Sequence, residues 1–224
     1  MRTLITTRDT LSRSLNAVRR AQKNSAGVEA SVRAIIAKVR RDGDKALLEL
    51  TRQFDGAKLK TLRVSKDEVA NAYKLESPDV IRALKRAKKN IEKFHMKSLK
   101  KNEPVVETEK GVSVWREFRP IERVGLYIPG GKAAYPSTVL MLGVPARVAG
   151  CKEIILCVPP NSNGEVPSAV LVAADLCGIS QIYKVGGAQA IAGMAYGTKT
   201  IPKVSKIFGP GNQYVTTAKL LVYG

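Results

Sequence analysis

The sequence predicts an α/β protein, in which a helical N-terminal region with a β-hairpin precedes an incomplete Rossmann-like parallel sheet flanked by helices. Residues 1–120 hold 29 basic and 15 acidic side chains, whereas residues 121–224 hold 9 and 4. Fourteen of the 18 glycines and 8 of the 11 prolines follow position 120. The spacing of apolar residues is helical in the first part, and short apolar runs alternate with Ala-rich stretches in the second. We therefore divide the chain into two domains, residues 1–119 and 120–224.

The N-terminal region is expected to be mainly helical. From Val28 to Leu50, apolar residues recur at spacings of three and four, and Gly43 marks a break in this pattern. Ser65, followed three residues later by Glu68, has the pattern of a capping box and predicts the start of a second helix.

The third expected helix is strongly basic. It opens at Ser77-Pro78, runs to about Lys101, and holds nine Lys and Arg residues between positions 82 and 101. Such a face could track the phosphates of a nucleic acid, or it could be the solvated side of a helix that packs on a core. We favour the solvated face, because no aromatic residues for base stacking interrupt the basic side and no nucleic-acid motif is present. The residues expected to face the core are Ile81, Leu84, Ile91 and Phe94.

A hairpin is predicted after this helix. Val105-Val106 and the segment from Val112 to Phe118 alternate apolar and polar residues around a turn at Glu109-Lys110-Gly111. Trp115 falls on the second strand, where core packing or a contact with a partner is expected.

The C-terminal region predicts strands that alternate with helices, which is typical of βαβ units and a parallel sheet. The expected strands are Val124 to Ile128, Ile154 to Val158, Ile182 to Val185 and Val204 to Phe208. The expected helices are Ser137 to Ala149, Val166 to Cys177, Ala188 to Tyr196 and Tyr214 to Tyr223.

Three of the strand ends carry Gly-rich turns. Because ligands bind beyond the carboxyl ends of parallel strands, and helix N-termini there favour anions, these turns predict a nucleotide or phosphate pocket. The glycines expected to let a ligand approach the backbone are Gly130, Gly131, Gly186, Gly187, Gly209 and Gly211. Neither GxxxxGK[ST] nor GxGxxG occurs, so neither common phosphate-binding fingerprint is met.

Each turn carries or adjoins one polar side chain that could orient a ligand: Tyr127, Gln189 and Asn212. The alternative interpretation is structural. Tyr127 would then be a core tyrosine, and Gln189 and Asn212 would be helix-capping or turn residues.

Five stretches resemble the signature sequences of the histidinol dehydrogenase family, in the family's order. They are Arg119 to Gly131 (RPIERVGLYIPGG), Ser137 to Met141 (STVLM), Pro145 to Cys151 (PARVAGC), Val185 to Ile191 (VGGAQAI) and Lys206 to Asn212 (KIFGPGN). The helical N-terminal region and its hairpin also fit the start of that family, with less distinctive sequence.

The resemblance implies an NAD-dependent, zinc-requiring dehydrogenase that oxidises L-histidinol through the aldehyde to L-histidine, in two hydride transfers that complete histidine biosynthesis. Family members contact NAD through a tyrosine, a glutamine and an asparagine in these stretches, which correspond to Tyr127, Gln189 and Asn212. Residues 120–224 would therefore be the NAD-contacting domain. The glycines of the three turns would assist at the pyrophosphate.

The resemblance also implies that part of the family's chemistry lies outside this sequence. Family members are about twice as long, and their zinc ligands and Glu-His acid/base pair belong to the second half. A single histidine, His95, cannot supply both a metal ligand and a general base. We therefore assign no catalytic residue and no metal ligand, and expect the chain to be a truncated or split enzyme that is inactive alone.

Composition excludes several other classes. The chain is 44% hydrophobic, which argues against disorder despite its net charge of +19. No run approaches the ~20 apolar residues of a membrane span, and the N-terminus lacks the apolar stretch of a signal peptide. Three cysteines without a CxxC pair suit a reduced compartment, so we expect a cytoplasmic protein that makes no membrane contact.

Two alternatives remain open. One is a related dehydrogenase that acts on another alcohol. The other is a non-catalytic binding protein on the same scaffold, whose basic surface attracts nucleic acid or an acidic partner. If the chain is half of an enzyme, apolar surface should be exposed, favouring self-association or a partner polypeptide that carries the second half.

Overall fold

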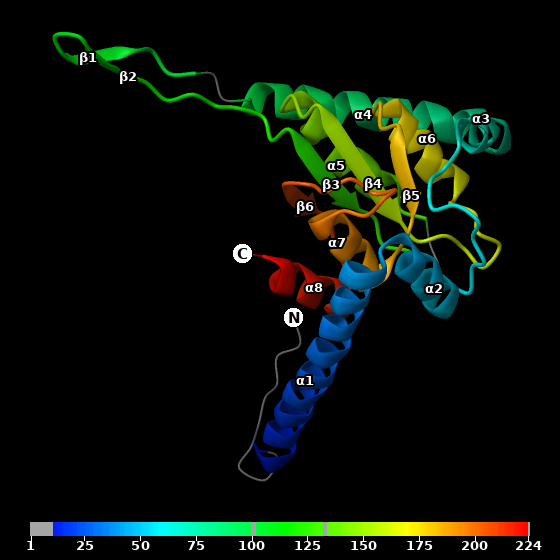
Figure 1. Cartoon of the computed structure of the whole chain (residues 1–224). Coiled ribbons are helices and arrows are strands. Elements are labelled where there is room, and N and C mark those ends of the chain that lie inside the picture. The colour runs from blue at the N-terminus through cyan, green and yellow to red at the C-terminus, as the bar shows by residue number, and fades with distance from the viewer. Residues whose placement is uncertain (1–10, 100–101, 132–133, 224) are drawn as a thin grey trace.

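The computed structural model describes residues 11–99, 102–131 and 134–223, with side chains from residue 27 onward. Within these residues, a four-stranded parallel sheet lies between two layers of helices, and a two-stranded hairpin projects away from this body (Figure 1). None of the described helices is long and apolar enough to cross a membrane.

The sheet consists of the four strands that the sequence predicts. They are β3 (Arg123–Tyr127), β4 (Glu153–Val158), β5 (Gln181–Lys184) and β6 (Lys206–Phe208), all parallel and in the order β5-β4-β3-β6. The helices that follow them are α5 (Pro136–Val148), α6 (Ser168–Leu176), α7 (Gly187–Tyr196) and α8 (Gln213–Val222). This arrangement confirms the predicted α/β class.

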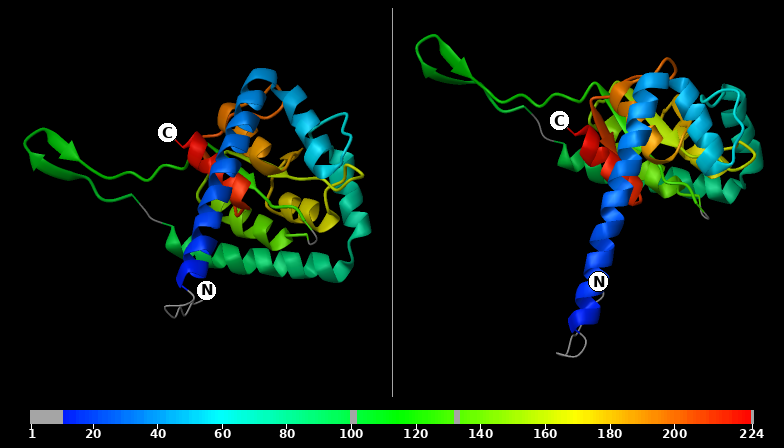
Figure 2. Two further views of the ribbon diagram at one scale, coloured as in Figure 1. Left: turned by 90° about the horizontal axis from the view of Figure 1, so that it is seen from below. Right: turned by 60° about the horizontal axis from the view of Figure 1, so that its bottom comes forward.

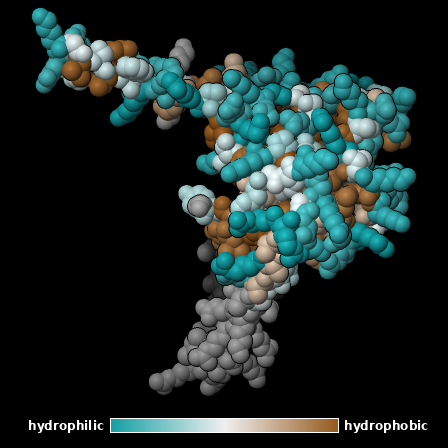
Figure 3. All heavy atoms as spheres, viewed as in Figure 1, coloured by the Kyte–Doolittle hydropathy of each residue, from teal (hydrophilic) through white to brown (hydrophobic). Residues whose placement is uncertain are grey.

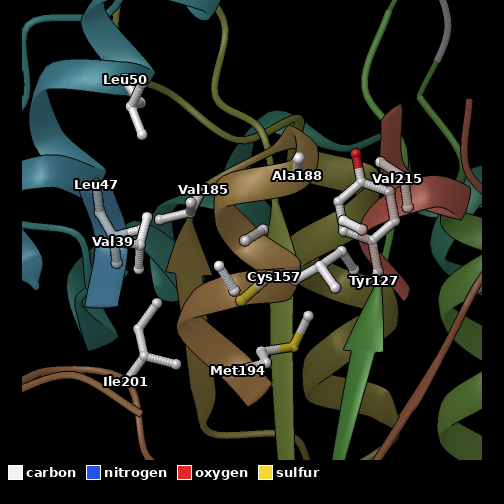
Figure 4. Packing of buried hydrophobic residues seen from close by; sticks show 14 of the residues in the cluster. Val39, Leu47, Leu50, Tyr127, Cys157, Val185, Ala188, Met194, Ile201 and Val215 are labelled. Atoms are coloured by element: carbon white, nitrogen blue, oxygen red, sulfur yellow. The ribbon is translucent and has the colours of Figure 1, made fainter. Parts of the chain in front are cut away.

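Each face of the sheet is covered by a separate apolar cluster, because successive strand residues point to opposite faces. Ile155 and Cys157 of β4 join the cluster formed with α1, α2, α7 and α8, part of which Figure 4 shows. Ile154 and Leu156 join the cluster formed with α3, α4, α5 and α6. Both regions of the chain contribute to both clusters.

The N-terminal helices begin and end largely as their local sequence predicts. Gly43, at φ 54°, separates α1 (Leu11–Asp42) from α2 (Asp44–Asp55), and α1 starts well before the predicted helix. In Figure 2 its N-terminal part extends beyond the body. The predicted capping box is present at the start of α3 (Lys66–Leu75), since the Ser65 hydroxyl accepts from the Glu68 N–H at 3.1 Å and the Glu68 carboxylate accepts from the Ser65 N–H at 2.9 Å.

Helix α4 (Pro78–Ser98) differs from expectation at its C-terminal end. Leu84 is buried and Ile81 and Ile91 are partly buried, as predicted, but Phe94 is 67% exposed. A helix of 21 residues outruns α5, which has 13 and packs along it, so the last turns of α4 have less to cover them. The Lys and Arg residues at 82, 85, 86, 89, 93 and 97 are exposed, and Lys100 and Lys101 lie outside the described residues.

The predicted hairpin forms an arm that stands clear of the body. Its strands are β1 (Val106–Glu109) and β2 (Val112–Val114), joined through Gly111 at φ 84°. Trp115 lies just beyond β2 and is 58% exposed, so the core-packing interpretation of this residue is wrong. Figure 3 shows hydrophobic patches on the arm among hydrophilic side chains.

Apolar surface is exposed on the body as well, as the sequence led us to expect. A groove of about 640 Å³ is lined almost wholly by apolar side chains, among them Val124, Met141 and Phe208. Strand β6, which forms one edge of the sheet, is short and largely exposed. The opposite edge, at β5, is covered by residues 62–64, whose backbone bonds to Ile182 and Lys184.

Candidate functional site

A pocket of about 910 Å³ lies at the carboxyl ends of the strands, within the size range of small-molecule and cofactor sites. Its walls come from the segments that follow β3, β4, β5 and β6, and also from α1 and α2. Tyr127, Gln189 and Asn212, the three polar residues predicted from separate turns, all line it.

Tyr127 ends β3 and connects two of the turns. Its side chain is 4% exposed and belongs to the core, and its hydroxyl accepts a hydrogen bond from the Gly187 N–H at 3.1 Å. In Figure 4 the hydroxyl points toward the end of the sheet where Ala188 begins α7. Burial raises the pKa of Tyr127, and the negative charge of Asp55 raises it further. Tyr127 is therefore both a core residue and part of the pocket wall.

Removal of this hydroxyl is expected to weaken the junction between the turns. Tyr127→Phe leaves the part-buried Gly187 N–H without its acceptor, which should lower the free energy of unfolding by about 1–3 kcal/mol. Urea unfolding followed by circular dichroism measures the change. Tyr183→Phe is the matched control, because that buried hydroxyl makes a single long bond of 3.4 Å to a side chain. Equal losses in the two variants would contradict the assigned role.

Gln189 occupies the third position of α7 and is 1% exposed. Its side-chain oxygen has no hydrogen-bond partner among the described residues, so it accepts from no N–H group of α7. Gln189 is therefore not a helix-capping residue. A buried amide oxygen without a partner is costly, and at the wall of a pocket it is satisfied when a bound molecule donates to it.

Asn212 has a structural role in addition to its place in the pocket. Its side-chain oxygen caps α8 by accepting from the N–H groups of Tyr214 and Val215 at 3.0 and 3.1 Å. The capping interpretation is correct for this residue. Because the oxygen is already engaged, only the NH₂ group of its side chain is left to contact a ligand.

The six predicted glycines divide into two groups. Gly130, Gly131 and Gly187 line the pocket, whereas Gly186, Gly209 and Gly211 do not. For several of them the chain itself, and not a ligand, requires a glycine. A Cβ on Gly130 would lie 2.2 Å from the Pro159 ring, and one on Gly186 would lie 2.5 Å from the same ring.

Four helices begin at this pocket, since Tyr135, Pro167, Gly187 and Asn212 at or next to their first residues all line it. The residue before each of α5, α6 and α7 makes no side-chain capping hydrogen bond, although the Tyr127 hydroxyl accepts from the first N–H of α7. The N–H groups of their first turns and the positive ends of their dipoles therefore favour a negatively charged group.

Helices α1 and α2 supply wall residues that the sequence did not identify, among them Ser31, Lys38 and Asp55. Asp55 has no motif around it, since Phe54-Asp55-Gly56 looks like an ordinary helix end. Asp55 belongs to the pocket wall only because α2 packs against α7 in the folded chain. Lys38 is paired with Glu49 at 2.7 Å.

No group of three or more His, Cys, Asp or Glu side chains that could hold a metal ion occurs in the described part of the chain. The three cysteines are buried and unpaired, and burial raises the pKa of each thiol, to about 11 for Cys177. His95 is partly buried on α4 with its ring edge against Phe94. The described residues therefore do not fit a zinc site, and we assign them no metal.

Comparisons with known proteins agree with the resemblance noted in the sequence. The family model for histidinol dehydrogenase matches residues 18–224. The chain is 53% identical over 205 residues to histidinol dehydrogenase from Bacteroides thetaiotaomicron, and 52% identical over 207 residues to that from Methanothermobacter thermautotrophicus; in both cases the match covers 92% of this chain and 48% of the relative.

The fold agrees as well. A crystal structure of histidinol dehydrogenase from Elizabethkingia anophelis superposes with a TM-score of 0.84 at 50% identity, covering 87% of this chain and 45% of that one. The chain thus spans about half the length of the relatives that it matches. With its parallel sheet and the signature stretches at the strand ends, the chain belongs to the histidinol dehydrogenase family.

Proposed function

We propose that this chain forms the NAD-contacting half of a histidinol dehydrogenase, with the dinucleotide bound in the pocket at the strand ends. The observation that carries the proposal is that Tyr127, Gln189 and Asn212 line one pocket of about 910 Å³, although they belong to three separate turns. NAD, when bound, supplies the acceptor for the hydride that leaves the alcohol and then the aldehyde.

The wall residues would divide the recognition of NAD between them. The unpaired Gln189 oxygen accepts a hydrogen bond from a donor on the dinucleotide, and the Asn212 NH₂ group donates one. The starts of α5 and α6, and the first-turn N–H groups of α7 that Tyr127 does not engage, favour the diphosphate. The Tyr127 hydroxyl holds the turn at Gly187 in place by accepting a hydrogen bond from the Gly187 N–H.

The substrate in this proposal is L-histidinol, by membership of the family. The zinc ligands and the acid/base pair would come from a further segment or a partner polypeptide, because the described residues hold no group suited to a metal. In this proposal residues 120–224 form the NAD-contacting domain. Helices α1 and α2, which lie outside that domain, add residues to the pocket wall.

Calorimetry with NAD tests the binding part of the proposal. We expect the 224-residue chain to bind NAD, and Gln189→Ala to weaken binding at least about tenfold, because the variant removes a desolvated acceptor that the ligand satisfies. Gln181→Ala is the matched control, since Gln181 lies at the amino end of β5, away from the pocket at the carboxyl ends, and should leave the affinity unchanged. An absence of NAD binding by the unaltered chain would refute the proposal.

Measurement of turnover tests whether the metal and acid/base chemistry lies outside these 224 residues. The isolated chain with zinc and L-histidinol should form no NADH, and addition of a polypeptide that carries the second half of a relative should restore NADH formation. Turnover by the isolated chain would show that the acid/base and metal chemistry lies within these 224 residues.

A further inference from the structure

A carboxylate of the pocket wall is left without a partner. Asp55 is the last residue of α2, and Gly56 in the left-handed conformation then turns the chain away. One carboxylate oxygen of Asp55 is buried and has no hydrogen-bond donor within reach among the described residues. Asp55 lines the pocket together with Tyr127 and Gln189.

Among the described residues, no cation compensates this charge. Lys38, the lysine that shares the pocket wall, is engaged with Glu49 at 2.7 Å. Burial alone raises the pKa of Asp55 to about 6, with no opposing contribution from a cation or a donor. Near neutral pH the carboxylate is therefore ionised and unpaired, an arrangement that destabilises the ligand-free fold and that functional sites often contain.

Two unpaired acceptors thus belong to residues that line one pocket, the Asp55 carboxylate and the Gln189 amide oxygen. A ligand that satisfies both must bring donors. Hydroxyl groups suit the carboxylate best, because O–H donors form short, charge-assisted hydrogen bonds with it. A phosphate group at the same place would meet a like charge, and the described residues place no free cation beside it.

We propose that Asp55 accepts hydrogen bonds from the ribose hydroxyls of the adenosine half of the dinucleotide, and thereby selects NAD over its 2′-phosphorylated form. This inference rests on the proposed function, since it assigns a specificity-determining residue to the same pocket. A carboxylate that bonds a ribose diol and repels a 2′-phosphate is a general solution to this discrimination. Here the carboxylate comes from an N-terminal helix and not from a strand end.

The test is calorimetry of the 224-residue chain with NAD and with NADP. The unaltered chain should bind NAD at least about tenfold more tightly than NADP. Asp55→Asn should weaken NAD binding about tenfold and reduce the preference for NAD to about twofold or less, since an amide neither accepts as strongly nor repels phosphate. Asp42→Asn is the control, because it removes a carboxylate of the neighbouring helix, paired with Arg41, that does not line the pocket.

The outcomes separate the two proposals. If the unaltered chain binds NAD but Asp55→Asn leaves the ratio of NAD to NADP affinity unchanged, the role of Asp55 is refuted and the proposed function stands. If the unaltered chain binds no NAD, the proposed function fails and the role of Asp55 fails with it.

Thermal melting without ligand shows that a loss of binding is not a loss of folding. Because the pKa of Asp55 in the folded protein, about 6, lies above its ordinary value of 3.8, the folded protein loses stability as the pH rises between these values. Asp55→Asn removes this penalty. The variant should melt at a higher temperature than the unaltered chain at pH 7.5, and the difference should shrink as the pH is lowered toward 4.

Discussion

Gly209→Ala is expected to destabilise the chain more than any other single alanine substitution considered. Gly209 follows β6 at φ 131°, and a Cβ at this position would lie 2.0 Å from the carbonyl oxygen of Tyr127. The obstacle is the backbone at the end of the inner strand β3, which cannot swing aside as a side chain could. We expect a loss of about 3 kcal/mol or more in the free energy of unfolding, measured by urea denaturation.

Gly131→Ala is the matched control. Gly131 has nearly the same backbone conformation, at φ 135°, but a Cβ there would meet nothing within 4 Å. Both variants carry the backbone strain of about 1–3 kcal/mol, whereas only Gly209→Ala adds the clash with Tyr127. If the two variants unfold at the same urea concentration, the close approach of β6 to Tyr127 is not what requires a glycine.

Leu47→Ala is the second substitution expected to have a large effect. Leu47 is fully buried on α2 and lies on the backbone of α7, where a Cβ on Gly193 would be 3.4 Å from its side chain. Figure 4 shows it in the cluster beside Val39 and near Ile201. The cavity left by the smaller side chain should lower the free energy of unfolding by about 2–5 kcal/mol.

The neighbouring Leu48 provides the comparison, because Leu48→Ala removes the same atoms from a side chain that is only partly buried. We expect that variant to lose less than half as much stability as Leu47→Ala. Since α2 also carries Asp55, NAD titration of Leu47→Ala should show a weakened affinity at temperatures where the variant is still folded. Similar stability of the two variants would mean that the packing of Leu47 against α7 does not stabilise the fold.

Much of the C-terminal half was predictable from local sequence. Short apolar runs flanked by Gly-rich turns can only be buried strands when helices of ten or more residues separate them, and β3 to β6 lie within two residues of the expected positions. The capping box at Ser65 and the break at Gly43 were equally readable, because both depend on residues next to one another in the chain.

The remaining features depend on contacts between distant segments. The helical period of α4 marks an apolar face but does not say where the neighbouring helices stop, so Phe94 was wrongly expected in the core. Trp115 was ambiguous for the same reason. The contribution of Asp55 to the pocket follows from the packing of α1 and α2 on α7 and α8, more than 130 residues later, and local pattern carries no information about that contact.

The contact of α1 with α8 has a consequence for synthesis on the ribosome. Val28, Val32 and Ile36 share one cluster with Val215 and Ala218, so the apolar face of α1 has no complete partner until α8 has been made. At translation rates of about 5–20 residues per second, that face waits roughly 10–40 seconds after its own synthesis. During this interval the nascent α1 is a natural substrate for chaperones, and the ligand pocket that it helps to wall cannot form before α8 is made.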